Sequence, residues 1–140
     1  MIVLDTNVVS EPMKPNGDPT VQAWLDRQIA ETLFLTTVNL AELLLGLEFL
    51  PTGRRKVRLR STMTELLSQL FCSRILPFDQ NAAETYASLV GKARAGGHIL
   101  SMADAQIAAI AKTHGYTVAT RDASPFTLAG VSIINPWKEV

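Results

Sequence analysis

Short runs of apolar and β-branched residues alternate along this chain with longer stretches in which apolar residues recur every three or four positions. Unbroken apolar runs are typical of strands that are buried on both faces, and the wider spacing is typical of helices. Their alternation predicts a parallel α/β sandwich. The strands are expected at Ile2–Leu4, Leu33–Thr36, Arg74–Phe78, Thr117–Thr120 and Val131–Ile134.

Helices are expected between these strands, because capping and breaking residues lie where the periodic stretches begin and end. Residues Pro51 to Gly53 either separate two helices or bend one, and the pattern leaves both possibilities open. The predicted helices run from Asp18-Pro19 through Ile29, from Thr37 through Leu47, from about Arg54 to Phe71, from Asp79 to the Gly96-Gly97 break, and from Ser101 to Gly115.

The composition fits a single folded domain over residues 1–140. Hydrophobic residues make up 47% of the chain and charged residues 19%, which is enough apolar material for a core and argues against disorder. Thirteen basic residues balance thirteen acidic ones. The net charge therefore offers no general attraction to nucleic acid, and any such binding requires a local basic patch.

Three features bear on the compartment. No apolar run is long enough to cross a bilayer, and the amino terminus lacks the basic segment of a secretory signal. The single Cys72, in the apolar stretch LFCS, is expected to be a buried thiol in a reducing environment. Together they predict a cytoplasmic protein without membrane contact.

Four acidic residues occupy positions from which their side chains can reach the carboxyl-terminal edge of the predicted sheet. Functional groups collect at this edge in open parallel sheets. Two of the acids follow strands, and two lie in the first turns of helices. They are Asp5, after the first strand; Glu42, in the helix after the second; Asp104, in SMADAQ; and Asp122, two residues after the fourth strand.

Each acid also has a purely structural interpretation. Asp5 can cap a turn, Glu42 can be an exposed helix residue, Ser101-x-x-Asp104 resembles a capping box, and Asp122 can belong to an ordinary turn. Their joint placement favours function, because four carboxylates at one edge repel each other unless a cation lies among them.

A cluster of carboxylate oxygens suits Mg²⁺ or Mn²⁺, and the chemistry that follows is phosphodiester hydrolysis. Other sites for phosphate chemistry fit less well. The chain contains no glycine-rich loop that would cradle a phosphate. An aspartate nucleophile after a strand typically has a second aspartate two residues later, where this chain has Asn7.

The segments LDTNVVSEP, TTVNLAELLLGL and SMADAQIAAIAKTHGYTVATRD resemble the PIN-domain ribonucleases. More narrowly, they resemble the VapC/FitB branch, the toxin half of prokaryotic toxin–antitoxin pairs. The matching runs extend from Ile2 to Trp137, so the resemblance covers nearly the whole chain. It implies a PIN-like three-layer sandwich with a central, mostly parallel five-stranded sheet flanked by helices.

The resemblance also implies a function. It implies that the four acids, Asp5, Glu42, Asp104 and Asp122, hold Mg²⁺ or Mn²⁺ for endonucleolytic cleavage of RNA. Thr6, Asn7 and Thr120 would orient the carboxylates or waters. The implied partners are an antitoxin that blocks the pocket and a second copy of the chain, with operator DNA contacted only through the antitoxin.

Two other functions stay open on the sequence: a PIN-like module that binds antitoxin or nucleic acid without cutting, and a metal-dependent nuclease of the same fold that cuts DNA. The sequence does not indicate which RNA is cut, at which site, or whether one metal ion acts or two.

The densest charge lies in GRRKVRLRS, where either a solvated helix face or an arm that contacts RNA phosphates is expected. Few aromatic residues lie nearby, so the sequence indicates no base preference. The basic residues of this stretch are Arg54, Arg55, Lys56, Arg58 and Arg60.

Overall fold

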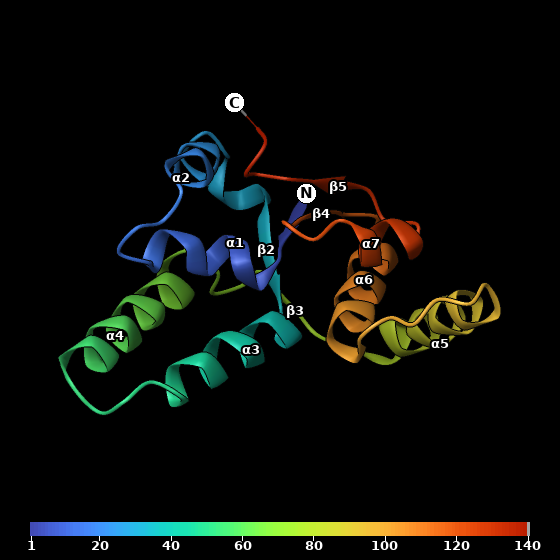
Figure 1. The fold of residues 1–140 in the computed structure, drawn as a ribbon, viewed down its shortest axis with the longest axis horizontal. Helices are drawn as coiled ribbons and strands as arrows, with labels where there is room; N and C mark the ends of the chain where they lie inside the picture. Colours follow the sequence, from blue (N-terminus) through green and yellow to red (C-terminus); the bar gives the residue numbers. More distant parts are fainter. Residues whose placement is uncertain (140) are drawn as a thin grey trace.

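A parallel sheet of five strands forms the centre of residues 1–139, the part of the chain that this computed structural model describes (Figure 1). The strand order is β3-β2-β1-β4-β5, and all of these pairings are parallel. The strands are β1 (Ile2–Leu4), β2 (Leu33–Thr36), β3 (Ile75–Leu76), β4 (Thr117–Ala119) and β5 (Ile133–Ile134). The predicted parallel α/β architecture is confirmed.

β1 is the central strand and the switch point of the sheet. The chain adds β2 and β3 on one side of β1 and then returns to place β4 and β5 on the other. Val3 is aligned with Phe34 of β2 and with Val118 of β4. In open parallel sheets a crevice forms beyond the carboxyl ends of the strands at such a switch point. The fold therefore places the residues after β1 and β4 beside each other at the carboxyl edge of the sheet.

Helices cover both faces of the sheet, which makes three layers (Figure 1). One side carries α1 (Thr6–Ser10), α2 (Pro19–Asp26), α3 (Thr37–Glu48) and α4 (Arg54–Gln69), and the other carries α5 (Gln80–Ala95), α6 (Met102–His114) and α7 (Ser124–Leu128). Two short 3₁₀ helices, η1 (Glu11–Met13) and η2 (Ala30–Thr32), flank α2.

The sheet has a hydrophobic core on each face, and the side chains of β1 alternate between the two cores. Leu4 packs into the core that contains Trp24 and Phe71, and Val3 packs into the core that contains Ile107. Because neighbouring residues of a strand point to opposite faces, a central apolar strand serves both cores at once. Ile107 belongs to α6, in which Ala105 and every residue from Ile107 to Ala111 are buried.

Capping residues explain several of the helix boundaries. Asp18 caps α2, Asp79 caps α5, and Ser101 caps α6, as predicted. Gly115 ends α6 with a φ of 72°, a left-handed conformation that glycine adopts at little cost. Residues 49–53 separate α3 from α4, so the open question about Pro51 is answered in favour of two helices.

Several predicted boundaries were wrong by a few residues. The first long helix ends at Asp26 instead of reaching Ile29, which begins the turn into η2 and is 67% exposed. Thr36 caps α3 in place of Thr37, because Thr36 and Asn39 form a reciprocal capping box. The helix predicted to reach Phe71 ends at Gln69, and β3 and β5 are shorter than expected.

Two helices and one side chain departed further from expectation. The five-residue helices α1 and α7 are too short to show helical periodicity, so the sequence did not predict them. The prediction of a buried Cys72 was wrong, since this thiol is exposed. The turn after α4 directs Phe71 into the core instead, where it is 1% exposed.

The described residues contain no helix that combines the length and apolarity needed to cross a membrane.

Candidate active site

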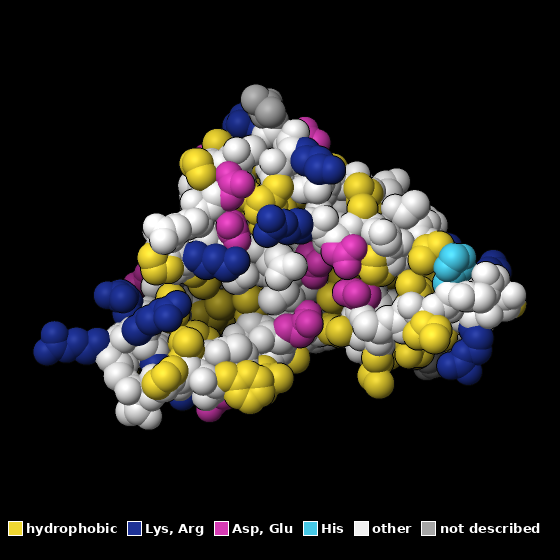
Figure 2. Space-filling view, viewed as in Figure 1, with side chains coloured by type: hydrophobic (Ala, Val, Ile, Leu, Met, Phe, Trp, Pro, Cys, Tyr) yellow, Lys and Arg dark blue, Asp and Glu magenta, His cyan; other side chains and the backbone are white. Residues whose placement is uncertain are grey.

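The site lies at the switch point, where the residues after β1 and β4 meet. Asp5 follows β1 directly, and its backbone N–H donates to the carbonyl of Ala119, the last residue of β4, at 2.9 Å. Thr120 follows β4 and is fully buried. Figure 2 shows Asp and Glu side chains gathered in the middle of this face, in the region where α1, α3 and α6 approach one another.

Asp5 is the centre of the hydrogen-bond network. Only 7% of its surface is exposed. Its Oδ1 accepts from the backbone N–H of Thr6 at 2.9 Å, and its Oδ2 accepts from Oγ1 of Thr120 at 2.8 Å. Asn39 adds a longer contact from Nδ2 to Oδ1 at 3.4 Å. Asp5 therefore caps α1, as its structural interpretation predicted, and the same carboxylate lies at the carboxyl edge of the sheet, where the functional interpretation requires it.

The electrostatics of Asp5 link it to two of the other acids. Burial raises the pKa of Asp5, the hydrogen bonds from Thr120 and Thr6 oppose this rise, and the charges of Asp104 and Glu42 add to it. A carboxylate that is buried near two like charges favours a cation beside it. Within residues 1–139 none of the four predicted acids forms an ion pair, so no described side chain already supplies that cation.

Glu42 joins the network through Thr6. It is exposed on α3, and its Oε1 accepts from Oγ1 of Thr6 at 2.8 Å. Thr6 in turn accepts from Nδ2 of Asn39 at 3.2 Å. A single threonine thus fixes Glu42 relative to the Asp5 end of α1. The orienting role that the family resemblance implied for Thr6 stays a prediction, and these are the contacts through which Thr6 would exert it.

Asp104 lies in the first turn of α6 and is half-buried. Its backbone N–H donates to Oγ of Ser101 at 3.2 Å, which is one half of the capping box suggested by the sequence. The reciprocal bond, from the backbone N–H of Ser101 to the Asp104 carboxylate, is not formed in the described structure. The Asp104 carboxylate is therefore not occupied by capping its own helix.

Asp122 is connected to the site through its backbone. Its N–H donates to Oγ1 of Thr120 at 3.1 Å, while the same hydroxyl donates to Asp5. The side chain of Asp122 is exposed and forms no hydrogen bond or ion pair within the described residues. Asn7 is likewise exposed on α1, and its side chain forms no hydrogen bond within residues 1–139.

Asn39 is a site residue that the sequence analysis missed. It is fully buried, its Oδ1 accepts from the N–H and the hydroxyl of Thr36, and its Nδ2 reaches Asp5 and Thr6. The signal was present in TTVN, because Thr followed three residues later by Asn at a strand–helix junction is a variant of the capping box. What the pattern did not show is that the free end of this amide faces the acids.

The donor set fits a hydrated Mg²⁺ ion. Carboxylate oxygens are the ligands that Mg²⁺ prefers, and the ion commonly keeps several waters while using one or two protein carboxylates. Residues 1–139 contain no closed group of three His, Cys, Asp or Glu side chains already arranged around an ion position. Asp5, Glu42 and Asp104 are linked through their charges, and a hydrated ion would need direct contact with only one or two of these carboxylates.

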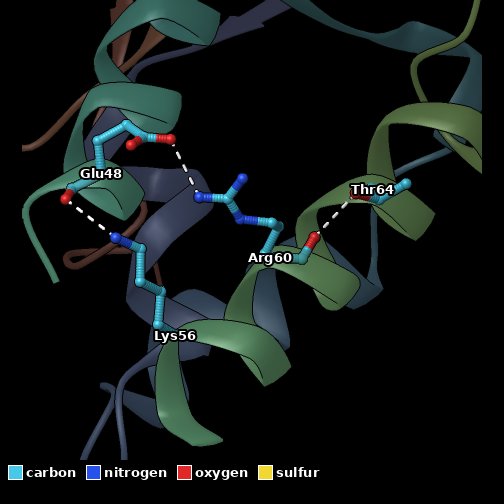
Figure 3. Close-up of polar contacts among 4 residues, drawn as sticks. All are labelled: Glu48, Lys56, Arg60 and Thr64. Carbon is cyan, nitrogen blue, oxygen red and sulfur yellow. Dashed lines mark hydrogen bonds and ion pairs between the residues drawn. The ribbon is translucent and has the colours of Figure 1, made fainter. Parts of the chain in front are cut away.

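The basic stretch lies on α4, where Figure 2 shows Lys and Arg side chains gathered apart from the central acids. Two of its residues are engaged by α3. Lys56 Nζ donates to the Glu48 carbonyl at 3.2 Å, and Arg60 Nη2 pairs with Glu48 Oε1 at 3.0 Å (Figure 3). These contacts hold α4 against the end of α3.

The other three basic residues are Arg54, Arg55 and Arg58. Each is exposed, and their guanidinium groups form no ion pair or hydrogen bond in the part of the chain that is described. Two basic residues of this stretch therefore bind α3, and the other three arginines have no ion pair or hydrogen bond through their guanidinium groups within the described residues.

Comparison with known proteins agrees with this architecture. The PIN domain model matches residues 2–130. The VapC ribonuclease Y4jK of Sinorhizobium fredii is 46% identical over 138 residues, which cover 99% of each chain. Toxin FitB of Neisseria gonorrhoeae is 44% identical over 139 residues, covering 99% of this chain and 100% of FitB.

Among solved structures, that of FitAB bound to the IR36 DNA fragment contains a chain that is 44% identical, with a TM-score of 0.94. The match covers 98% of this chain and 96% of that one. These similarities confirm the resemblance recognised in the sequence motifs and the PIN-like fold that it implied. This chain belongs to the PIN-domain family and is a homologue of proteins named VapC ribonuclease and toxin FitB.

Proposed function

We propose that this protein is a Mg²⁺-dependent endoribonuclease and the toxin of a toxin–antitoxin pair. The observation that carries the proposal is Asp5, a buried carboxylate at the sheet switch point whose pKa is raised by burial and by its acidic neighbours. The 46% identity to a VapC ribonuclease supports RNA as the substrate.

The residues around Asp5 have separate tasks in this proposal. Bound Mg²⁺ or Mn²⁺ would polarise a phosphoryl oxygen and lower the pKa of a bound water, which supplies hydroxide near neutral pH. Asp5, Glu42 and Asp104 would hold the ion, and Asp122 would complete the acidic edge. The hydroxyls of Thr120 and Thr6 fix the carboxylate orientations through the bonds described above.

Substrate binding depends on charge compensation. RNA is a polyanion, so carboxylates at the edge repel it until a cation neutralises them. The exposed Arg54, Arg55 and Arg58 on α4 supply positive charge away from the acids. We assign to these arginines contacts with RNA phosphates at some distance from the phosphodiester bond that is cleaved.

The partners are proposed from similarity. The FitAB assembly is bound to a DNA fragment, and one of its chains closely resembles this one. By analogy, this chain binds a cognate antitoxin, meets operator DNA only through that antitoxin, and forms a homodimer.

A cleavage assay tests the proposed activity. Purified protein is incubated with structured RNA in Mg²⁺, in Mn²⁺ and in EDTA, with DNA digested in parallel. Cleavage of RNA by the wild type in either metal, lost in EDTA and in Asp5→Asn, supports the proposal. Asp26→Asn, which neutralises an exposed acid on α2, is the matched control and retains activity. Equal cleavage by wild type and Asp5→Asn, or none with any metal, contradicts it.

A further inference from the structure

Arg121 occupies an unusual position for a cation in this molecule. It lies between Thr120, which holds Asp5, and Asp122, so it is placed at the acidic edge. An arginine there would be expected to pair with the carboxylates, since guanidinium–carboxylate pairs are the strongest charge-assisted hydrogen bonds. Yet within residues 1–139 the Arg121 guanidinium forms neither an ion pair nor a hydrogen bond.

Trp137 explains where the Arg121 side chain goes. The guanidinium carbon of Arg121 lies 5.2 Å from the centroid of the Trp137 ring, within the range of a cation–π interaction. The indole is itself packed against the core that contains Trp24 and Phe71. Trp137 is 16 residues after Arg121 in the sequence. Because its ring is packed against the core, it gives the exposed arginine a fixed surface to stack on.

The Trp137 indole interacts through the face of its ring and not through its N–H group. Its Nε1 is buried and has no hydrogen-bond partner among the described residues. An unpaired buried donor destabilises the folded state, and a phenylalanine at this position would avoid that penalty. Tryptophan is, however, the aromatic residue that attracts a cation most strongly.

The nearby acid Glu11 does not hold Arg121 either. Its pKa is lowered chiefly by the hydrogen bond from Lys14, then by the backbone N–H of Asp18, and least by the charge of Arg121. Lys14 pairs with Glu11 at 2.9 Å, and Asp18 N donates to Glu11 Oε1 at 3.1 Å. Glu11 is thus occupied by other groups.

We propose that Arg121 is a phosphate-binding residue for the RNA strand and that Trp137 is its positioning residue, holding the guanidinium away from the carboxylates. Stacking on an aromatic face leaves the N–H groups in the guanidinium plane free to bind phosphate oxygens. Stacking on Trp137 also keeps the acidic edge open for a metal ion. An Arg121 side chain released from Trp137 would pair with the carboxylates and so take the place of the ion.

This inference rests on the proposed ribonuclease function, and its test is separable from the cleavage assay. Binding of a short fluorescein-labelled single-stranded RNA in Mg²⁺ is followed by anisotropy as the salt concentration is varied. Every protein carries Asp5→Asn, so the RNA stays intact. Adding Arg121→Gln is expected to weaken binding about tenfold, the loss of one charge-assisted contact. The slope of log affinity against log salt is expected to fall by about 0.7, the value for one phosphate on a single strand.

Lys92→Gln is the matched control, since it removes one positive charge from an exposed position on α5 and should leave the salt slope unchanged. Trp137→Phe keeps a ring beneath the guanidinium and should have a smaller effect than Arg121→Gln. An Arg121→Gln variant with unchanged affinity and slope, or a protein that binds no RNA, overturns the proposal. The cleavage assay with wild-type protein reports separately on the proposed function.

A second measurement tests the positioning role without RNA. Free Mn²⁺ is measured by electron paramagnetic resonance during titration of proteins with intact Asp5. Trp137→Leu should weaken Mn²⁺ binding severalfold, and adding Arg121→Gln should restore it, because the competing guanidinium is gone. A purely structural tryptophan would give no such rescue, so failure of the double variant to recover affinity overturns the positioning role.

Discussion

The hydroxyl of Thr120 performs two tasks that few side chains can combine. It donates to Asp5 Oδ2 at 2.8 Å and accepts from the Asp122 backbone N–H at 3.1 Å. A hydroxyl can donate and accept simultaneously, which a methyl group cannot. One buried atom therefore sets the orientation of the Asp5 carboxylate and the path of the backbone at Asp122.

Thr120→Val tests this residue with almost unchanged shape. Both partners lose a buried hydrogen bond, so we expect the free energy of unfolding to fall by about 1–3 kcal/mol. Metal affinity and cleavage rate should fall about 10–100-fold, as for other groups that orient a metal ligand. Thermal denaturation, Mn²⁺ titration and RNA cleavage measure these effects. Thr120→Ser, which keeps the hydroxyl, should retain most activity, and equal losses in both variants would contradict the assignment.

Asp5→Asn should separate function from stability. Since a group that orients a ligand is worth about 10–100-fold in activity, loss of the ligand itself should exceed about 100-fold. Without metal the variant should be the more stable protein at neutral pH, because it removes a buried charge that lies near Asp104 and Glu42.

The pH dependence of this difference has a definite sign. The folded pKa of Asp5 is raised above its ordinary value of 3.8, so between the two values the folded protein binds more protons than the unfolded chain. The contribution of Asp5 to stability therefore falls as pH rises through that window. Urea denaturation at several pH values should show Asp5→Asn gaining on the metal-free wild type across this range. A difference that does not vary with pH would contradict the raised pKa.

At the scale of elements, the site is assembled from the starts of three helices. Asp5 caps α1, Thr36 and Asn39 cap α3, and Ser101 caps α6 beside Asp104. Backbone N–H groups at a helix start favour negative charge, so these ends offset part of the repulsion between the acids. Capping, usually a matter of local stability, here also places the side chains of the site.

Asn39→Asp separates the two roles of the α3 cap. An aspartate keeps the oxygen that accepts from Thr36 but loses the donor to Asp5 and Thr6 and adds a buried negative charge. We expect α3 to form normally, with the metal-free protein losing stability at neutral pH and recovering it in acid, where the new carboxyl is protonated. Circular dichroism and thermal denaturation at two pH values measure this. Equal destabilisation at both would contradict it.

The division of the basic stretch on α4 gives a further prediction. Replacing Arg54, Arg55 and Arg58 together by glutamine should weaken RNA binding and lower its salt dependence, because these side chains are unengaged. Glu48→Gln instead weakens an exposed ion pair with Arg60, and should cost less than about 1 kcal/mol of stability without weakening RNA binding. Anisotropy titrations and thermal denaturation distinguish the two. An unchanged salt slope in the triple variant would indicate a merely solvated face.

At the scale of the whole molecule, the site depends on the alignment of β1 with β4. Both strands are covered by cores on their two faces, and Asp5 N bonds Ala119 O across the junction. A strand that is buried on both faces holds its end rigidly, which suits a site where small displacements of a carboxylate matter. Ligands that bind this edge are therefore linked to the stability of the whole fold.

Metal binding should reveal this linkage. An ion that binds the folded state alone stabilises it by about 2.7 kcal/mol when its concentration is 100 times its dissociation constant. We expect Mg²⁺ and Mn²⁺ to raise the melting temperature of the wild type, and more so as pH rises, because the ligands must be ionised. Asp5→Asn should respond weakly. Calorimetry with Na⁺ at matched ionic strength is the control, and equal shifts in both proteins would indicate a non-specific salt effect.

Local information determined much of this protein. The strands show as unbroken apolar runs, and Asp18, Asp79, Ser101 and Gly115 mark helix ends because capping involves residues a few positions apart. The positions of Asp5 and Asp122 after two strands predicted that they would lie at the same edge, since parallel strands align their carboxyl ends.

Only the tertiary structure decided how the residues at that edge are used. Whether Asn39 turns its amide toward Asp5, whether the Asp104 carboxylate caps its own helix, and whether Cys72 is buried all depend on neighbours from distant segments. The contact of Arg121 with Trp137 is of the same kind, because the two residues are brought together by the chain's return along β5. Periodicity and capping report on a helix or a strand, whereas the burial of a polar group depends on what the rest of the fold packs against it.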